Sequence, residues 1–244
     1  MLKLNCDLGE LTETENNDAL IMPMIDQANI ACGGHAGDQQ SMINTVKLAK
    51  KNHVMIGAHP SYPDKANFGR LSMVIEASEL QTSLLEQINT LSEICNLQQS
   101  QLSYVKPHGA LYNDMMKELS IFETVCKTLS QLEVKLPLMI QALPDTGQYQ
   151  TIANQYGITM LFEAFADRAY QSNGLLVPRS QTGAVLHQSD KVIAQISQLI
   201  KHQQLTSIDG NKLTLHVDSL CVHGDNDAAL ALIRALRKLL NEQG

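Results

Sequence analysis

The chain has 244 residues, of which 44% are hydrophobic and 18% are charged, and its formal net charge is −7 at pH 7. This composition supports a buried core and argues against a disordered chain. An acidic balance without a basic cluster argues against nucleic acid as a partner. No apolar run approaches the ~20 residues that span a bilayer.

Two further features of composition bear on the compartment. The first ten residues reach Asn5 and Asp7 too early for the apolar region of a signal peptide. The five cysteines show no CxxC spacing and are odd in number, which is typical of reduced thiols. We therefore expect a cytoplasmic protein that does not bind membranes. Cys6, Cys32 and Cys221 lie in apolar runs, where we interpret them as core filler.

Short apolar runs recur along the chain and are predicted to be β-strands. Most of them are nearly continuous in apolar character, as expected for parallel strands that are covered on both faces. The predicted strands are residues 2–7, 28–33, 54–59, 103–108, 136–143, 159–166 and 218–225.

Amphipathic patterns between these runs predict helices, the clearest being residues 38–52, 78–97 and 226–241. Asp38 is expected to cap the first of them. Ser78 and Gln81 have the spacing of a capping box at the start of the second. Residues 168–190 contain Gly and Pro without a clear period and predict a long ordered loop. Residues 206–217 predict a hairpin around Asp-Gly.

The alternation of strands and helices continues without a linker or a change of composition. It predicts one α/β domain over residues 1–244, either a barrel or an open doubly wound sheet. We favour an irregular seven-stranded (β/α) barrel, because a regular barrel would need eight units. Periodicity alone leaves the open sheet as an alternative.

Polar side chains gather at the carboxyl ends of the predicted strands. In a parallel β/α fold these ends share one face, which is where such enzymes hold their chemistry. A single histidine at a strand end is usually a packing residue, and Asp38 and Asp225 are expected to cap helices. Several histidines and carboxylates on one face favour a functional site. The residues at strand ends are Asn5, Asp7, Glu10, Gly33, Gly34, His35, His59, Lys106, His108, Gln141, Glu163, Asp167, Arg168, His223 and Asp225.

The stretch VKPH places Lys106 and His108 two residues apart, and Pro107 between them marks the last residues of a strand. Lysine at this position could pair with a carboxylate or phosphate, or lose its proton if desolvated. Glu163 lies inside an apolar run, so its carboxylate needs a partner. The segment 60–70 is expected to form a loop over the end of its strand.

Loop residues supply further candidates for binding. Arg70 could hold an anion, whereas Asp167 and Arg168 could simply form a solvated pair. In ANIACGGHAGD, Gly33 and Gly34 let the backbone pass close to a ligand or turn sharply after the strand, and His35 then faces the pocket.

Two kinds of chemistry are compatible with these residues. A serine nucleophile is disfavoured because there is no GxSxG motif, and a phosphate loop because there is no GxxxxGK[ST] motif. Asp7, His35 and His59 could hold a divalent metal ion with an open position for water. They could equally form a proton-transfer set without metal. Spacing does not decide between the two.

Seven motifs occur in order from residue 4 to residue 225, covering nearly the whole chain. They are LNCDLGE, ANIACGGHAGD, IGAHPSYPD…FGR, VKPHGALYN, EAFADRAY, GLLVPR…GAVL and VHGD. Together they resemble the LamB/YcsF family, the A subunit of the prokaryotic ATP-dependent 5-oxoprolinase. The departures lie in loops: VHGDNDAA lacks the Pro that often follows GD, and the loop before NFGR is shorter.

The resemblance implies an irregular seven-stranded barrel of the glycoside hydrolase/deacetylase type. It implies cleavage of 5-oxo-L-proline to L-glutamate with hydrolysis of ATP, the co-substrate, to ADP and phosphate. Mg²⁺ is expected with ATP, and subunits B and C are the expected partners; self-association stays open. The expected catalytic residues are Asp7, His35, His59, Lys106, His108 and Glu163. The expected substrate-binding residues are Asn5, Gly34, Arg70, Asp167 and Arg168.

Two other functions remain open at this stage. One is a metal-dependent deacetylase that acts on an N-acetylated carbohydrate, which would need no ATP. The other is a non-catalytic scaffold subunit that binds a small acid and positions a partner enzyme.

Overall fold

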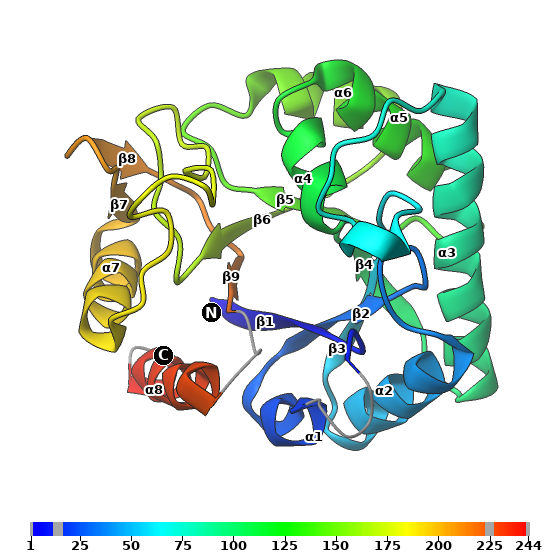
Figure 1. The fold of residues 1–244 in the computed structure, drawn as a ribbon, viewed down its shortest axis with the longest axis horizontal. Helices are drawn as coiled ribbons and strands as arrows, with labels where there is room; N and C mark the ends of the chain where they lie inside the picture. The colour runs from blue at the N-terminus through cyan, green and yellow to red at the C-terminus, as the bar shows by residue number, and fades with distance from the viewer. Residues whose placement is uncertain (1, 12–16, 223–226, 243–244) are drawn as a thin grey trace.

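The computed structural model describes residues 2–11, 17–222 and 227–242. Seven parallel strands form a closed barrel in the order β1-β2-β3-β4-β5-β6-β9, and β9 pairs with β1 (Figure 1). The irregular seven-stranded barrel is therefore confirmed, and the open sheet is wrong. The strands are β1 (Lys3–Leu8), β2 (Gln27–Ala31), β3 (Met55–His59), β4 (Leu102–Val105), β5 (Leu138–Gln141), β6 (Met160–Phe165) and β9 (Ser219–Cys221).

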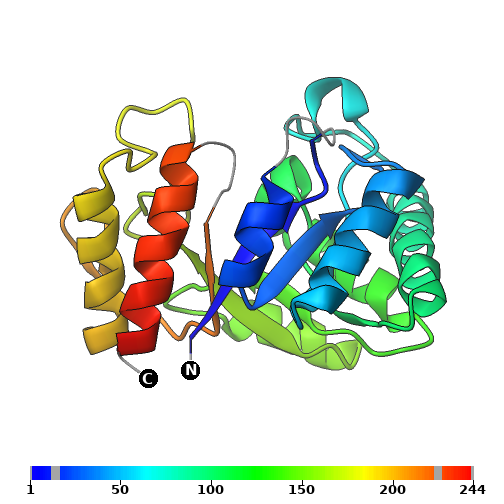
Figure 2. The same cartoon turned by 90° about the horizontal axis from the view of Figure 1, so that it is seen from below.

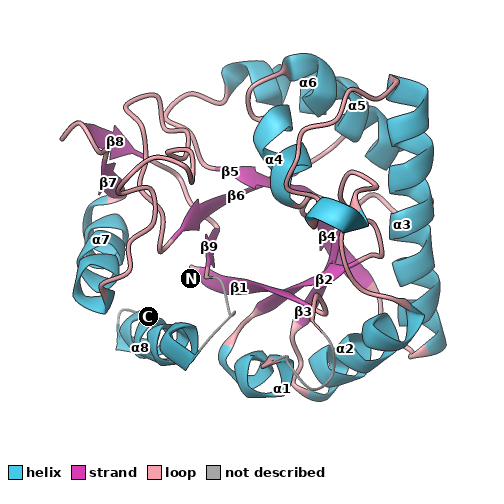
Figure 3. Cartoon of the chain, in the orientation of Figure 1, coloured by secondary structure: helices cyan, strands magenta, loops and turns pink. Residues whose placement is uncertain are grey.

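Helices surround the barrel on its outer side (Figure 3). None of the helices within the described ranges is long and apolar enough to cross a membrane. The α-helices are α1 (Asp18–Ile21), α2 (Gln39–Lys51), α3 (Ala77–Leu97), α4 (Gly109–Met115), α5 (Leu119–Ser130), α6 (Gly147–Gln155), α7 (Ser189–His202) and α8 (Asp227–Glu242). Two short 3₁₀ turns are η1 (Met22–Met24) and η2 (Lys65–Asn67).

The helix starts test the capping predictions. Asp38 caps α2 as expected, because its carboxylate accepts a hydrogen bond from the Ser41 amide at 2.8 Å and the Ser41 hydroxyl accepts one from the Asp38 amide. The capping box predicted at Ser78 is wrong. Helix α3 begins at Ala77, and the Leu80 amide donates to the Glu76 carbonyl, so Ser78 already lies inside the first turn.

The decorations outside the barrel follow the sequence closely. Strands β7 (Gln204–Thr206) and β8 (Lys212–Thr214) form the expected antiparallel hairpin. The segment between β6 and α7 is the expected long loop, and two isolated bridges brace it, Arg168–Val185 and Tyr170–Leu176. Both this loop, drawn in yellow, and η2, drawn in cyan, lie at the same end of the barrel (Figure 2).

One irregularity in the barrel has an identifiable cause. The pairing of β3 with β4 shifts register between Ile56 and Gly57. The Tyr104 ring packs directly on Gly57, where an added Cβ would overlap it. On its other edge, β4 pairs with β5 through the single pair Val105 and Leu138. A missing side chain therefore makes room for a buried tyrosine whose hydroxyl reaches the candidate site.

The cysteines and the last predicted strand were also assigned from the sequence. All five cysteines are buried and form no disulfide, in agreement with their interpretation as core filler. The predicted polar residues His223 and Asp225 lie outside the described residues.

Candidate active site

A cavity of about 500 Å³ opens at the carboxyl ends of the barrel strands. Asp7, His59 and Phe165, from the ends of β1, β3 and β6, line it together with residues that follow β4. Two loops form the rest of the wall, one ending at Arg70 and one running beyond Arg168. Its cationic side chains are Arg70, Lys106, Lys117, Arg168 and Arg179. The cavity is thus polar at its base and rich in positive charge around its walls.

The end of β1 delivers two carboxylates to this cavity. Gly9 adopts a φ of 73°, a left-handed conformation that suits glycine, and so turns the chain between Asp7 and Glu10. The Gly9 amide donates to the Asp18 carboxylate at 2.9 Å, and the Thr45 hydroxyl donates to the same oxygen. Burial raises the pKa of Asp18. The turn that aims Glu10 is therefore held from behind by a buried carboxyl group.

Lys106 is the central charge at the base of the cavity. Its Nζ lies 3.0 Å from Asp7 Oδ1 and 3.2 Å from Glu163 Oε2, and both Lys106 and Glu163 are buried. Burial disfavours the ammonium, but the two carboxylates outweigh it and raise the pKa of Lys106 well above its usual value. The partner that the sequence required for Glu163 is this lysine. The neighbouring Cys221 stays a neutral thiol, because burial raises its pKa.

A network of amides lies beneath this charge group. Asn29 Nδ2 donates to Asp7 Oδ1 at 2.7 Å and to Asn5 Oδ1 at 2.8 Å, and the Tyr104 hydroxyl donates to Asn29 Oδ1 at 2.6 Å. Asn5 Nδ2 in turn donates to the Ser219 hydroxyl at 2.7 Å. Asn5 is fully buried and is not among the residues that line the cavity. The structure places Asn5 in the base that positions Asp7 and Lys106.

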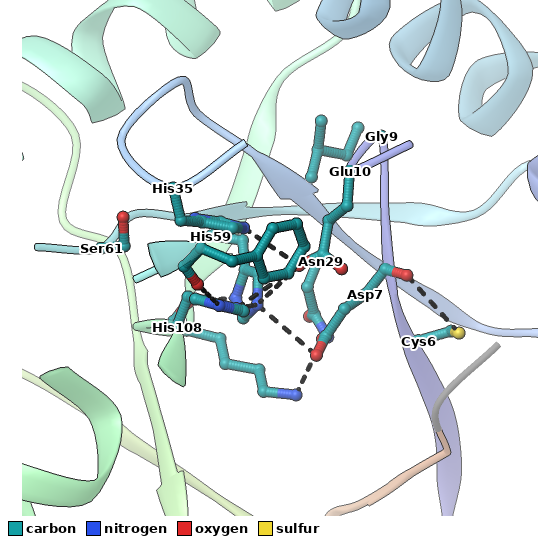
Figure 4. Close-up of polar contacts among 12 residues, drawn as sticks. Cys6, Asp7, Gly9, Glu10, Asn29, His35, His59, Ser61 and His108 are labelled. Carbon is teal, nitrogen blue, oxygen red and sulfur yellow. Dashed lines mark hydrogen bonds and ion pairs between the residues drawn. The ribbon is translucent and has the colours of Figure 1, made fainter. Parts of the chain in front are cut away.

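Three histidines and a carboxylate form a second cluster beside Asp7, which we call the imidazole cluster: Glu10, His35, His59 and His108. One Glu10 oxygen lies 3.0 Å from His35 Nε2 and 3.4 Å from His108 Nδ1 (Figure 4). His59 Nε2 lies 3.5 Å from Asp7 Oδ2, so Asp7 joins the two clusters. Burial, with a further contribution from His59, lowers the pKa of His35 to about 2 and that of His108 to about 3.

The loop that precedes Arg70 covers this cluster, as its sequence suggested. Phe68 and Gly69 adopt left-handed conformations, and a Cβ on Gly69 would contact His35 and His108. The Phe68 carbonyl accepts a hydrogen bond from His108 Nε2 at 3.0 Å. Arg70 is exposed, lines the cavity, and stacks with its guanidinium carbon 4.8 Å from the centre of the Phe68 ring. It is well placed to meet an anion.

The other predicted binding residues take different positions. Arg168 is buried and donates to the Val177 carbonyl at 2.6 Å and to the Ala184 carbonyl at 3.2 Å. Burial, together with the nearby Arg179, lowers its pKa. Arg168 therefore anchors the long loop while one part of it faces the cavity. Asp167 is not among the cavity-lining residues.

Gly34 is also absent from the cavity lining. It packs against the side chains of Gln87 and Ser61, where an added Cβ would clash. The Ser61 amide donates to Gln87 Oε1 at 3.0 Å, which ties the loop after β3 to helix α3. Gly34 thus lets the side chains of Gln87 and Ser61 approach the backbone next to His35.

Sequence reasoning gave no role to several residues that the structure places in the site. Glu10 stands at a strand end, yet only the turn at Gly9 shows that it faces the histidines. Tyr112 and Arg179 line the cavity from a helix and a loop. Both residues lie in motifs that carry the family resemblance, VKPHGALYN and GLLVPR, but neither motif by itself assigned them a role.

Taken together, these features define a class: a closed seven-stranded β/α-barrel protein whose strand ends carry paired carboxylates, a buried lysine and clustered histidines. This end of the barrel is where such folds hold catalytic groups. The LamB/YcsF family model matches residues 2–244, and the chain belongs to that family.

Named relatives are similar to this chain over almost its whole length. A protein of Vibrio cholerae serotype O1 named as the A subunit of 5-oxoprolinase is 46% identical over 243 residues, covering 99% of this chain and 98% of the relative. A protein of the same name from Pseudomonas fluorescens is 48% identical over 244 residues, with the same coverage. The crystal structure of a lactam utilization protein from Thermus thermophilus superposes with a TM-score of 0.89 at 31% identity, covering 99% of this chain and 96% of that chain.

Proposed function

We propose that this chain is the A subunit of an ATP-dependent 5-oxoprolinase and that it carries out the opening of the lactam ring. The relatives that bear this subunit name support the proposal at 46–48% identity over almost the whole chain. The observation that carries it within the structure is the Asp7–Lys106 pair, at 3.0 Å, on the wall of the cavity. The cavity also falls in the size range of small-molecule sites, roughly 300–1,000 Å³.

The chemistry explains why ATP is needed. A five-membered lactam is unstrained and a poor electrophile, and transfer of the γ-phosphoryl group of ATP to its oxygen makes the ring carbon reactive. Water adds to that carbon, and the C–N bond breaks as the nitrogen takes a proton, which gives γ-glutamyl phosphate. A second water releases phosphate and leaves L-glutamate. The balance is one ATP and two waters for one glutamate, one ADP and one phosphate.

Asp7 is the residue we assign to the proton transfers. Its side chain is 14% exposed and lines the cavity, while Lys106 and Asn29 hold one of its oxygens. In this scheme Asp7 accepts the proton of the attacking water and returns it to the leaving nitrogen. Lys106 stabilises the negative charge of the phosphoryl group carried by the oxygen of the reacting carbon.

His108 and Glu163, two of the expected catalytic residues, are further candidates for proton transfer to the ring nitrogen. Glu163 has no exposed surface and does not line the cavity, so we assign it to holding Lys106. We expect Arg70, exposed on the cavity wall, to meet the carboxylate or phosphoryl group of the substrate.

Subunits B and C are the partners we propose, with ATP and Mg²⁺ as the energy source. A short apolar segment at the cavity rim fits an intersubunit contact. It follows Arg70 directly, and we call it the rim segment: Leu71, Ser72, Met73 and Val74, whose apolar members are exposed. A partner that delivers an activated substrate to the cavity would dock beside this opening.

Reconstitution tests the proposal. Purified chain is mixed with subunits B and C, ATP, Mg²⁺ and 5-oxo-L-proline, and glutamate and phosphate are measured. We expect glutamate only in the complete mixture, and its loss in Asp7→Asn with the assembly intact. Absence of glutamate from the complete mixture would overturn the proposal. Amide hydrolysis of an N-acetylated sugar without ATP would instead favour a deacetylase, and full activity of Asp7→Asn would favour a scaffold.

A further inference from the structure

Two backbone carbonyls fix the proton positions of His59 and His108. His59 Nδ1 lies 2.7 Å from the Lys106 carbonyl oxygen, and His108 Nε2 lies 3.0 Å from the Phe68 carbonyl oxygen. A carbonyl only accepts hydrogen bonds, so each of these ring nitrogens must carry a proton. In a neutral ring the other nitrogen then carries a lone pair. Those two nitrogens are His59 Nε2 and His108 Nδ1.

The two lone-pair nitrogens face each other. His59 Nε2 lies 3.0 Å from His108 Nδ1, a distance at which two lone pairs repel unless something positive lies between them. Further electron-pair donors surround the same point. Glu10 Oε1 lies 3.4 Å from His108 Nδ1 and 3.9 Å from His59 Nε2, and Asp7 Oδ2 lies 3.5 Å from His59 Nε2. The arrangement has the charge pattern of a cation site.

The spacing of the donors also fits an ion. A point equidistant from Glu10 Oε1, His59 Nε2 and His108 Nδ1 lies about 2.0 Å from each atom, close to the ~2.0–2.2 Å lengths of zinc–imidazole and zinc–carboxylate bonds. The backbone carbonyls on the far ring nitrogens are the usual outer partners of metal-bound histidines.

His35 belongs to the cluster without being a ligand in this geometry. Its ring stacks on His108 at a centroid distance of 3.6 Å and an angle of 4°. An ion in the plane of His108 therefore lies far out of the plane of His35, whereas an imidazole binds metals in its own plane. His35 Nε2 instead contacts Glu10 Oε1 at 3.0 Å and is placed to orient that carboxylate.

We propose that Glu10, His59 and His108 form a binding site for one divalent transition-metal ion, with Zn²⁺ as the best-fitting probe, and that His35 is a positioning residue. Two imidazoles and one carboxylate favour such ions over Mg²⁺. Because all three ligands line the cavity, the ion has an open side toward a substrate or water. A metal ion in this place would polarise a carbonyl oxygen or lower the pKa of bound water. The site stands on side-chain geometry alone and holds whether or not a lactam is the substrate.

The ligand set differs from the sequence-based expectation of Asp7, His35 and His59. His59 is common to both sets. Glu10 and His108 replace the other two, while Asp7 borders the site through Oδ2. Single substitutions can therefore distinguish the two sets.

The test measures metal binding by the full-length chain without 5-oxoproline or ATP. The chain is stripped with a chelator and titrated with Zn²⁺ by calorimetry, and bound metal is counted after dialysis. We expect one ion per chain and a rise in melting temperature. Co²⁺ should bind with visible absorption bands that Zn²⁺ abolishes. Because substrate is absent, failure here is distinguishable from failure of the lactam reaction.

The variants sharpen the assignment. Glu10→Gln and His108→Leu should weaken Zn²⁺ binding more than ~100-fold, and His35→Leu about 10–100-fold, with partial recovery in His35→Gln, which keeps a donor for Glu10. His216→Ala is the matched control, because the His216 side chain is 76% exposed and outside the cluster. It should bind Zn²⁺ like the wild type.

Three results would overturn the site. One is a wild-type chain that binds less than one ion. Another is Zn²⁺ affinity unchanged in Glu10→Gln and His108→Leu, each checked for folding by circular dichroism. The third is a chelated chain that binds no Zn²⁺ and shows an imidazolium at pH 7 by nitrogen NMR. That result would put a proton between His59 and His108.

Discussion

Replacing Lys106 by Met should destabilise the barrel strongly, because the lysine is the only cation in contact with Glu163 among the described residues. Methionine has a similar length but no charge, so Asp7 and Glu163 would be left as two carboxylates without their common partner. Removing one member of a buried ion pair costs about 3–5 kcal/mol. This is a large share of the roughly 5–15 kcal/mol by which domains are stable.

The assay is equilibrium unfolding in urea at pH 7. For a chain of this size the slope is about 3 kcal/mol per molar urea, so the midpoint of Lys106→Met should fall by about 1–1.7 M. Glu163→Gln alone leaves Lys106 paired with Asp7 and should cost about 1–3 kcal/mol. In the double variant, the buried carboxylate that lost its partner is itself removed. The double variant should therefore be more stable than Lys106→Met alone.

A double-mutant cycle of Lys106→Met and Glu163→Gln measures the coupling between the two side chains. The expected coupling between the two positions is about 1–3 kcal/mol, well outside the additivity found for separate sites. Lys117→Met is the control, since Lys117 is an exposed lysine on the same cavity wall, and its midpoint should stay near that of the wild type. Purely additive losses, or a wild-type midpoint for Lys106→Met, would refute the buried charge group as a source of stability.

Three further substitutions test the surroundings of the site. Gly57→Ala would push a methyl group into the Tyr104 ring and should cost about 1–3 kcal/mol in urea unfolding, whereas an equal midpoint would show that the ring can move away. Asp18→Asn keeps an acceptor for the Gly9 amide but removes the carboxyl group. Burial raises the pKa of Asp18 in the folded chain above its unfolded-state value, so the wild type loses stability as the pH rises through this range. The variant should therefore gain stability relative to the wild type as pH rises from below 3.8, the ordinary pKa, toward 7, and a pH-independent difference in unfolding free energy would contradict this. Val74→Glu in the exposed rim segment should leave the melting temperature unchanged but weaken binding to the proposed partner subunits B and C in sedimentation experiments; unchanged assembly would place the contact elsewhere.

The fold could be predicted because its signals are local. Each barrel strand is a short apolar run. A parallel strand that is covered on both faces has nearly continuous apolar character, so the sequence itself marks where the strands lie. Closure of the barrel was a weaker inference, since no local pattern distinguishes a closed sheet from an open one. The capping box at Ser78 failed because α3 begins at Ala77 with Glu76 as an N-cap residue that makes no side-chain cap, so Ser78 already lies inside the first turn.

The site was predictable to the level of which face and which strands. Asp7, His59 and Lys106 lie at the cavity because parallel strands end together. The depth of each side chain was beyond the sequence. Asn5 and Glu163 share the inward face of their strands with Asp7 and Phe165, which lie two residues further along and line the cavity. Asn5 and Glu163 therefore lie one layer deeper in the barrel, where both contact Lys106.

Asp7 joins the two clusters of this site. One of its oxygens belongs to the charge group of Lys106 and Asn29, and the other lies 3.5 Å from His59 in the imidazole cluster. A carboxylate fixed on one side by two donors cannot turn freely toward a substrate, so its second oxygen keeps one direction, into the cavity beside Glu10. That constraint is what a proton-transferring group needs, because a base is effective only within hydrogen-bond reach of the proton that it takes. The buried lysine thus fixes the orientation of the Asp7 carboxylate, and the imidazole cluster lies beside its second oxygen.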